Sequence, residues 1–199
     1  MSTVELRATA ADQRILAATR RCIARWGVAK TTLDDVAGEA GCSRATIYRL
    51  FPGGKDNLLT ALAQREVAAL FDALRLRLDG IDDLEELVVA GITEAARQLA
   101  AHDALQFLLA HEPEVLLPRI CFHHMDCVLR TISEFAAPYL APHVGADEAS
   151  RAAEWLARMV LSYTACPAPW VDVRDEESVR RLVRAFVLPG LVQQATLRG

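Results

Sequence analysis

The chain has 199 residues, a hydrophobic content of 52% and a formal net charge of −4 at pH 7. This length predicts one or two domains, and the apolar content excludes an intrinsically disordered chain. No apolar run approaches the roughly 18 residues that span a bilayer, the N-terminus lacks a signal-peptide pattern, and the five cysteines are scattered, so we expect a cytoplasmic protein without membrane segments or a disulfide framework.

Three helices are predicted at the N-terminal end. Apolar side chains recur at three- and four-residue steps from Ile15 to Trp26, which predicts a first helix that ends at Gly27. A second helix ends at Gly41, and Ser43 can cap a short third helix that runs to Arg49 or Phe51. The candidates for capping the second helix are Thr31 and Thr32, with Asp34 and Asp35 as capping-box partners.

Helical periodicity continues through the rest of the chain. After a strong stop at Pro52-Gly53-Gly54, a long helix is predicted from about Lys55 to Leu78. Further helices are predicted at about 82–101, 103–111, 118–137, 147–166 and 175–197. Pro118 suits a first helical turn and Asp147 a cap, and we expect linkers at 112–118, 138–145 and 166–175. Because no alternating run predicts a strand, the expected fold class is all-α with about nine helices.

Residues 32–51, TLDDVAGEAGCSRATIYRLF, have the spacing of a helix-turn-helix unit. Ala37 and Ala40 are small enough to let the two helices approach closely around the Gly41 turn. The second helix is short and offers side chains that suit a major groove: Arg44, Thr46, Tyr48 and Arg49. Residues near the two helix N-termini, Thr31, Thr32 and Ser43, could also anchor phosphates. The spacing alone leaves open an ordinary helical hairpin with solvated polar side chains.

The net charge is unevenly distributed along the chain. Residues 1–60 carry nine basic and six acidic side chains, whereas residues 61–199 carry 13 basic and 20 acidic ones. The N-terminal segment is therefore +3 and the remainder is −7. A mildly basic segment on an acidic body favours contact between that segment and a polyanion.

Residues 10–62 closely resemble the DNA-binding domain of the TetR family of transcriptional regulators. The motifs that carry the resemblance are Trp26-Gly27, Thr31-Thr32, Ala37…Ala40-Gly41, Tyr48…Phe51 and Lys55…Leu58. The resemblance implies that one set of residues faces double-stranded DNA: Arg44, Ala45, Thr46, Tyr48 and Arg49. It implies phosphate contacts from Thr31, Thr32 and Lys55. The turn at Pro52-Gly53-Gly54 and the pair Arg49-Leu50 depart from the usual family pattern, so a relative's operator sequence cannot be transferred.

The same resemblance implies a DNA-binding domain at residues 1–54 and a helical ligand-binding and dimerisation domain at residues 55–199. In the family, the last two helices form a four-helix bundle between subunits. Here residues 149–163 and 179–191 each carry an apolar stripe, although either stripe could face the chain's own core. A homodimer also fits recognition of a palindromic operator, since it presents two recognition helices about one helical turn apart.

Family members hold a small-molecule effector within the body helices. The candidate ligand-binding residues are Phe71, Leu105, Leu108, His111, Phe122, His124, Met125, Trp155 and Met159. The segment Cys121–Cys127 contains two cysteines and two histidines at helical spacing, which is compatible with a metal or redox role, with the lining of a pocket by His124 or Met125, or with simple packing. Packing is favoured because no C-x-x-C accompanies them, so no metal and no cofactor are predicted.

The residues and the resemblance together predict a ligand-responsive transcriptional regulator. We expect a repressor that binds a palindromic operator as a homodimer and is released by an apolar or amphipathic small molecule. The alternative is a helical small-molecule-binding protein that no longer reads DNA. Motifs of common enzyme classes are absent from the sequence, so an enzyme is not expected.

Overall fold

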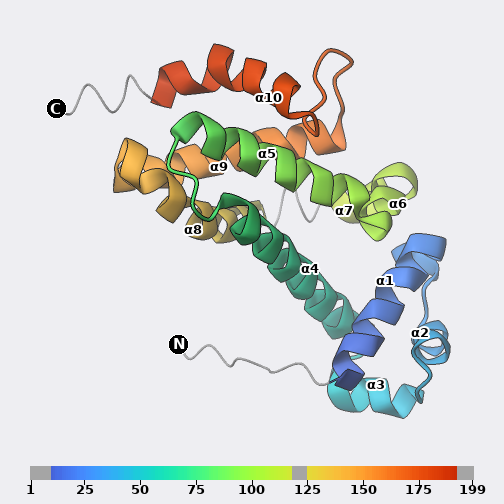
Figure 1. Ribbon diagram of the computed structural model, residues 1–199. Coiled ribbons are helices and arrows are strands. Elements are labelled where there is room, and N and C mark those ends of the chain that lie inside the picture. Colours follow the sequence, from blue (N-terminus) through green and yellow to red (C-terminus); the bar gives the residue numbers. More distant parts are fainter. Residues whose placement is uncertain (1–9, 118–124, 192–199) are drawn as a thin grey trace. The chain divides into compact units, whose positions relative to one another are not determined.

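The computed structural model describes residues 10–117 and 125–191, and every regular element among them is a helix (Figure 1). The predicted all-α fold class is therefore confirmed, with helices α1–α10 in these residues where about nine helices were expected. The chain forms two compact units. We call the first the head, which comprises the residues up to Ala68 and Asp103–Val115. The second is the body, which comprises Ala69–His102 and the residues from Leu116 onward.

The head combines the N-terminal helices with one helix from later in the chain. Its helices are α1 (Ala10–Lys30), α2 (Leu33–Ala40), α3 (Arg44–Leu50), the first part of α4 (Lys55–Leu78) and α6 (Asp103–His111). Helix α1 packs against both α2 and α6. The expected domain boundary lay at residue 54, but apolar side chains of α4 and α6 (Leu58, Leu62 and Ala104) also complete the core of the head. This compact unit therefore extends beyond the expected one.

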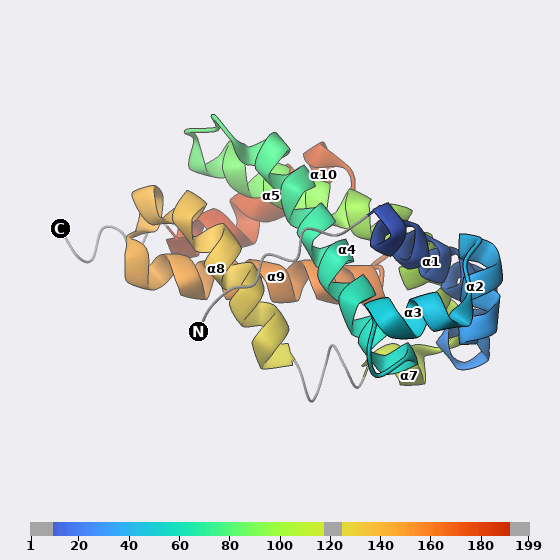
Figure 2. The same ribbon diagram turned by 90° about the horizontal axis from the view of Figure 1, so that it is seen from below.

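The body contains the remaining helices around a second apolar core. They are the rest of α4, α5 (Leu84–Ala101), α8 (Met125–Val144), α9 (Ala146–Ala165), α10 (Glu176–Leu182) and the π-helical turn η2 (Val183–Val187) that continues α10. Helix α8 packs along α9, and α5 lies against α9 and α10 (Figure 2). Core side chains come from all of these layers, among them Phe71, Val89, Leu140, Val160 and Val183.

Helix α8 continues through a segment that the sequence predicted to be a linker. Prolines 138 and 142 lie inside the helix, which ends only at Val144. A proline in a helix interior costs about 3 kcal/mol because it removes a hydrogen bond and its ring crowds the preceding turn. Here Leu140 and Val144 are buried in the body core, and their burial offsets much of that cost. The expected helix end at residue 137 is therefore wrong.

Two other local expectations also need correction. Helix α9 begins at Ala146 after Gly145 and has no side-chain cap, so Asp147 is a residue of the first turn and not the cap. Its carboxylate there lies near the positive end of the helix dipole. The expected linker at 112–118 contains a short helix, α7 (Pro113–Leu117), and Pro118 lies outside the described residues.

Within the part of the chain that the structure describes, no helix combines the length and the apolar character needed to cross a membrane.

Candidate nucleic-acid interface

The start of α2 is fixed by a reciprocal cap. Thr32 adopts an extended conformation, and its hydroxyl accepts the N–H of Asp35 at 3.2 Å. The carboxylate of Asp35 accepts the backbone N–H of Thr32 at 2.9 Å, so the predicted capping box is present. The Thr32 hydroxyl also donates to this carboxylate, and these bonds lower the pKa of Asp35 below its usual value. The Thr32–Asp35 pair therefore holds the first turn of α2 at the surface of the head.

Helix α3 is the short second helix of the unit, and Ser43 caps it as predicted. The hydroxyl of Ser43 accepts the N–H of Thr46 at 3.1 Å. Ile47 points the other way and is fully buried in the head core, which fixes the rotation of α3 about its axis. The exposed surface of α3 carries four of the residues predicted to contact DNA: Arg44, Ala45, Tyr48 and Arg49.

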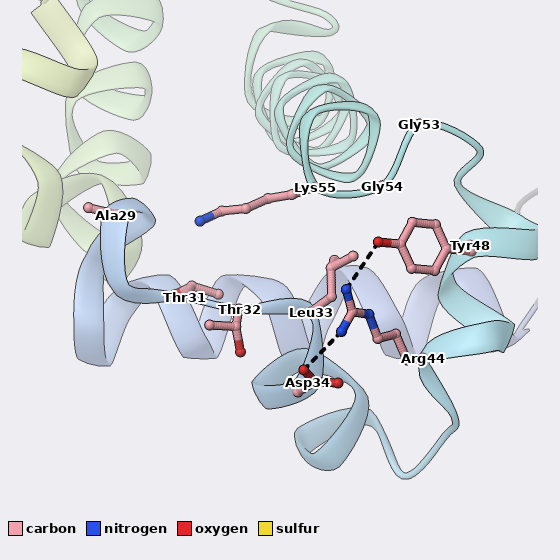
Figure 3. A pocket seen from close by; sticks show the side chains of 10 residues that line it. All are labelled: Ala29, Thr31, Thr32, Leu33, Asp34, Arg44, Tyr48, Gly53, Gly54 and Lys55. Atoms are coloured by element: carbon pink, nitrogen blue, oxygen red, sulfur yellow. Dashed lines mark hydrogen bonds and ion pairs between the residues drawn. The ribbon is translucent and has the colours of Figure 1, made fainter.

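A hollow of about 490 Å³ opens on the head between the end of α1, the start of α2, α3 and the start of α4 (Figure 3). Its lining residues are Ala29, Thr31, Thr32, Leu33, Asp34, Arg44, Tyr48, Gly53, Gly54 and Lys55. Five of these, Thr31, Thr32, Arg44, Tyr48 and Lys55, were predicted from the sequence to contact DNA. Residues from four consecutive elements thus meet in one concave surface.

Arg44 crosses this hollow and has two partners in it. Its guanidinium donates to the Asp34 carboxylate at 3.2 Å and to the Tyr48 hydroxyl at 3.3 Å, as Figure 3 shows. The guanidinium carbon also lies 5.5 Å from the centre of the Tyr48 ring, which is within cation–π range. The Tyr48 hydrogen bond and the Asp34 charge raise the pKa of Arg44. The arginine and the tyrosine therefore present their polar ends together.

The turn before α4 brings the Tyr48 ring close to the backbone. Gly54 has a φ of 72°, and a Cβ built on it would lie 3.2 Å from a carbon of that ring. Glycine therefore serves here both for its positive φ and for the space it leaves. Tyr48 is still 45% exposed, so its hydroxyl end is accessible from solvent.

Two residues predicted to contact phosphates, Thr31 and Lys55, make hydrogen bonds within the head. Thr31 is only 3% exposed, and its hydroxyl donates to the Gly27 carbonyl at 2.6 Å. The ammonium of Lys55 donates to the Val28 carbonyl at 2.6 Å, so it ties the first residue of α4 to the end of α1. Lys55 still lines the hollow, where its charge adds to that of Arg44.

Helix α1 is interrupted at Gly27, where the sequence predicted its end. Gly27 has φ 80° and ψ 174°, and a last helical turn follows it as far as Lys30. After the break, the N–H groups of Val28 and Ala29 donate hydrogen bonds to the carboxylate of Glu112 at 2.8 and 3.4 Å. Sequence reasoning missed Glu112 because it placed this residue in a linker.

The comparisons with known proteins match the segment of the chain that carries this surface. Residues 15–62 match the family model described as "Bacterial regulatory proteins, tetR family". The uncharacterized HTH-type transcriptional regulator Rv1255c of Mycobacterium tuberculosis (strain ATCC 25618 / H37Rv) is 28% identical over 183 residues, which cover 90% of this chain and 84% of the relative. The chain belongs to the TetR family.

Solved structures show the same fold for the TetR-family chain as a whole. The TetR family repressor AlkX from Dietzia sp. strain DQ12-45-1b superposes with a TM-score of 0.66 at 21% identity, covering 92% of this chain and 97% of AlkX. The fatty acid degradation regulator FadR from Bacillus halodurans gives a TM-score of 0.64 at 20% identity, covering 90% and 95%. These neighbours and the relative above are named as regulators.

The predicted ligand-binding residues of this TetR-family chain are divided between the two units. Leu105, Leu108 and His111 lie on α6 in the head, where Leu108 packs against the head core and His111 stacks on Phe107. In the body, Phe71 is buried against Phe135, Met159 packs on the body core, and Trp155 is half exposed. Phe122 and His124 lie outside the described residues, as does the side chain of Met125.

The Cys121–Cys127 segment, whose spacing is compatible with a metal or redox role, is largely outside the described residues. Among the residues that the structure does describe, no three His, Cys, Asp or Glu side chains are grouped as metal ligands would be.

The apolar stripes on the last two helices of the TetR-family body mostly face its own core. Val179, Leu182, Val183 and Val187 are buried there, and so are Ala152 and Val160. Large apolar side chains nevertheless remain on the outer surface of these elements. Trp155 of α9 is 50% exposed and Phe186 of η2 is 72% exposed.

Proposed function

We propose that this TetR-family protein is a ligand-responsive repressor that binds a palindromic operator as a homodimer. The observation that carries the proposal is the hollow on the head, where Arg44 and Tyr48 present donors beside the capped N-terminus of α2. Guanidinium, phenol and exposed helix N-terminal groups are the donors that bind phosphates and base edges in DNA. The same surface is framed by a short helix whose rotation is fixed by buried Ile47.

Pairing of Arg44 with Asp34 is compatible with this role. Both side chains are mostly exposed, so the ion pair contributes little stability and a phosphate or guanine can compete for the guanidinium. In the absence of DNA, the hydrogen bond to Asp34 keeps Arg44 extended across the hollow. Thr32, Ser43 and Thr46 would contact the phosphate backbone of the DNA from the N-termini of α2 and α3. Ala45 and Arg49 would lie nearest the bases.

Exposed aromatic side chains on the last two helices support a homodimer through these helices. The buried stripes on α9 and α10 are used within the chain, so a partner would meet the other side, where Trp155 and Phe186 lie. Aromatic side chains of this size are typical of the centre of a protein interface. A two-fold dimer gives two copies of α3, which a palindrome of two half-sites would match.

The proposed effector is an apolar or amphipathic small molecule bound in the body. Two similar structures support this class: AlkX is described as implicated in biodegradation of n-alkanes, and FadR as a regulator of fatty acid degradation. Release of the operator would require that the ligand bind the DNA-free conformation more tightly than the DNA-bound one. Among the candidate ligand residues, Phe71 and Met159 lie at the body core.

Footprinting on the DNA upstream of the protein's own gene tests the proposal. We expect protection of a palindromic site whose half-sites lie about one helical turn, or a multiple of it, apart. The protection should weaken steeply with added salt, since phosphate contacts release counterions. Uniform protection of any DNA, or none at any upstream site, would contradict a sequence-specific repressor and favour a small-molecule-binding protein that no longer reads DNA.

A further inference from the structure

A buried carboxylate meets the backbone of the head at the place where α1 breaks. Glu112 directly follows α6, is 9% exposed, and accepts the N–H groups of Val28 and Ala29. Because Gly27 leaves the helical conformation, the residues after it start a new turn, whose first N–H groups have no helical partner. The carboxylate of Glu112 therefore acts as a cap that is supplied from 84 residues away in the sequence.

Space for this cap exists only because residue 27 is a glycine. A Cβ built on Gly27 would lie 2.1 Å from Oε1 of Glu112 and 2.4 Å from its Cδ. The carboxyl group thus occupies the position that any other side chain would need. The pairing of Gly27 with Glu112 is a specific fit and not an incidental surface contact.

The peptide that Glu112 holds is also held from its other side. The carbonyl of Val28 accepts the ammonium of Lys55, the first residue of α4, at 2.6 Å. Three residues after Val28, Thr31 donates to the Gly27 carbonyl, and Thr32 then caps α2. The backbone at the break in α1 is therefore bound by Lys55 of α4 and by Glu112 at the end of α6, and we call these contacts the clamp. The clamp directly precedes the helix-turn-helix.

We propose that Glu112 is a positioning residue for operator recognition, which fixes the Val28–Ala29 turn and thereby the start of α2 and the shape of the hollow that contains Arg44 and Tyr48. This inference rests on the proposed function. Glu112 does not line the hollow. It acts through the backbone, so its effect on DNA binding passes through the amides of Val28 and Ala29.

The test uses the full chain with Glu112→Ala, Glu112→Gln and the matched control Glu114→Ala, which removes an exposed carboxylate two residues later in α7. Two quantities are measured: the amide hydrogen exchange of Val28 and Ala29, and the affinity for the footprinted operator by fluorescence anisotropy. Exchange reports the clamp directly, and a variant that only lowers global stability would speed exchange throughout the head core as well.

For Glu112→Ala, exchange at the two amides should rise and operator affinity should fall, each by at least about tenfold, because a charge-assisted hydrogen bond is lost. Glu112→Gln retains an acceptor oxygen and should rescue both quantities to within a few-fold, and Glu114→Ala should change neither. If Glu112→Ala does not fold, Glu112→Asp, which shortens the reach by one methylene, replaces it with the same expectations in smaller measure.

Unchanged operator affinity in Glu112→Ala, or lost affinity with both amides still protected, would overturn the proposal. So would failure of Glu112→Gln to rescue. If the wild-type chain itself shows no preference for its upstream DNA over random DNA, the proposed function fails, and the positioning role fails with it. The exchange data would then still show whether the clamp exists.

Discussion

Substitution of Gly27 by alanine should destabilise the head by two separable effects. The first is the backbone: φ 80° with ψ 174° lies in a region that is essentially restricted to glycine, and a side chain there costs about 1–3 kcal/mol. The second is the contact of the new Cβ with Glu112, 2.1 Å from its Oε1. The carboxylate must move, which breaks its 2.8 Å bond to Val28 and costs about 1.5–3 kcal/mol for a charge-assisted bond.

The sum predicts a loss of about 2.5–6 kcal/mol in the free energy of unfolding, a large share of the 5–15 kcal/mol typical of a folded chain. Urea unfolding at fixed protein concentration measures it, since the stability of an oligomer depends on concentration. In a Glu112→Ala background the carboxylate is absent, so Gly27→Ala should cost only the backbone share of about 1–3 kcal/mol.

The double-mutant cycle isolates the contact between the two residues. We expect a coupling of about 1.5–3 kcal/mol between Gly27→Ala and Glu112→Ala. Costs that add to within about 0.5 kcal/mol would show that the two residues are independent and would refute the fit on which the clamp depends.

Three further predictions concern the dimer, the cap and acid. Phe186→Glu should convert a dimer to monomers in light scattering, whereas Leu76→Glu, at a more exposed position on α4, should not; an intact Phe186→Glu dimer would move the interface elsewhere. Ser43→Ala should cost about 1 kcal/mol in thermal unfolding, and no loss would contradict the cap. Hydrogen bonds from Arg184 lower the pKa of Glu85, so the unfolded state binds the proton more tightly than the folded state. Stability should therefore fall as the pH drops from the usual glutamate pKa towards the lowered one. Glu85→Gln should flatten this dependence of stability on pH, and an unchanged dependence would contradict the pairing of Glu85 with Arg184.

Features with a local chemical cause could be predicted from the sequence. The caps at Thr32 and Ser43 depend on residues three positions away, and both are confirmed. The break at Gly27 and the end of α2 at Gly41 also follow from single residues. The exposed side chains Arg44, Tyr48 and Arg49 of α3 could be predicted because they are polar residues of a short, capped helix.

Features with a distant cause could not be predicted in this way. Glu112 bonds backbone amides, which carry no sequence signal, and a lone glutamate before Pro113 is typical of a linker. The prolines of α8 predict a helix end, because the burial of Leu140 that stabilises the continued helix depends on neighbours that only the fold supplies. The apolar stripes on the last two helices were visible, but periodicity does not tell which surface covers them.

The most direct test of the account is the operator affinity of Arg44→Ala/Tyr48→Ala. Arg174→Ala is the matched control, since Arg174 is similarly exposed and also paired with an aspartate, but lies in the body. Fluorescence anisotropy titrations compare the affinity for the operator with the affinity for a scrambled duplex. The ratio of the two affinities should fall by at least about tenfold in the double variant, because each base contact contributes about 1–3 kcal/mol. The control should retain the wild-type ratio. Dimerisation should persist in both variants. Wild-type operator preference in Arg44→Ala/Tyr48→Ala would contradict the assignment of this surface as the DNA-reading face.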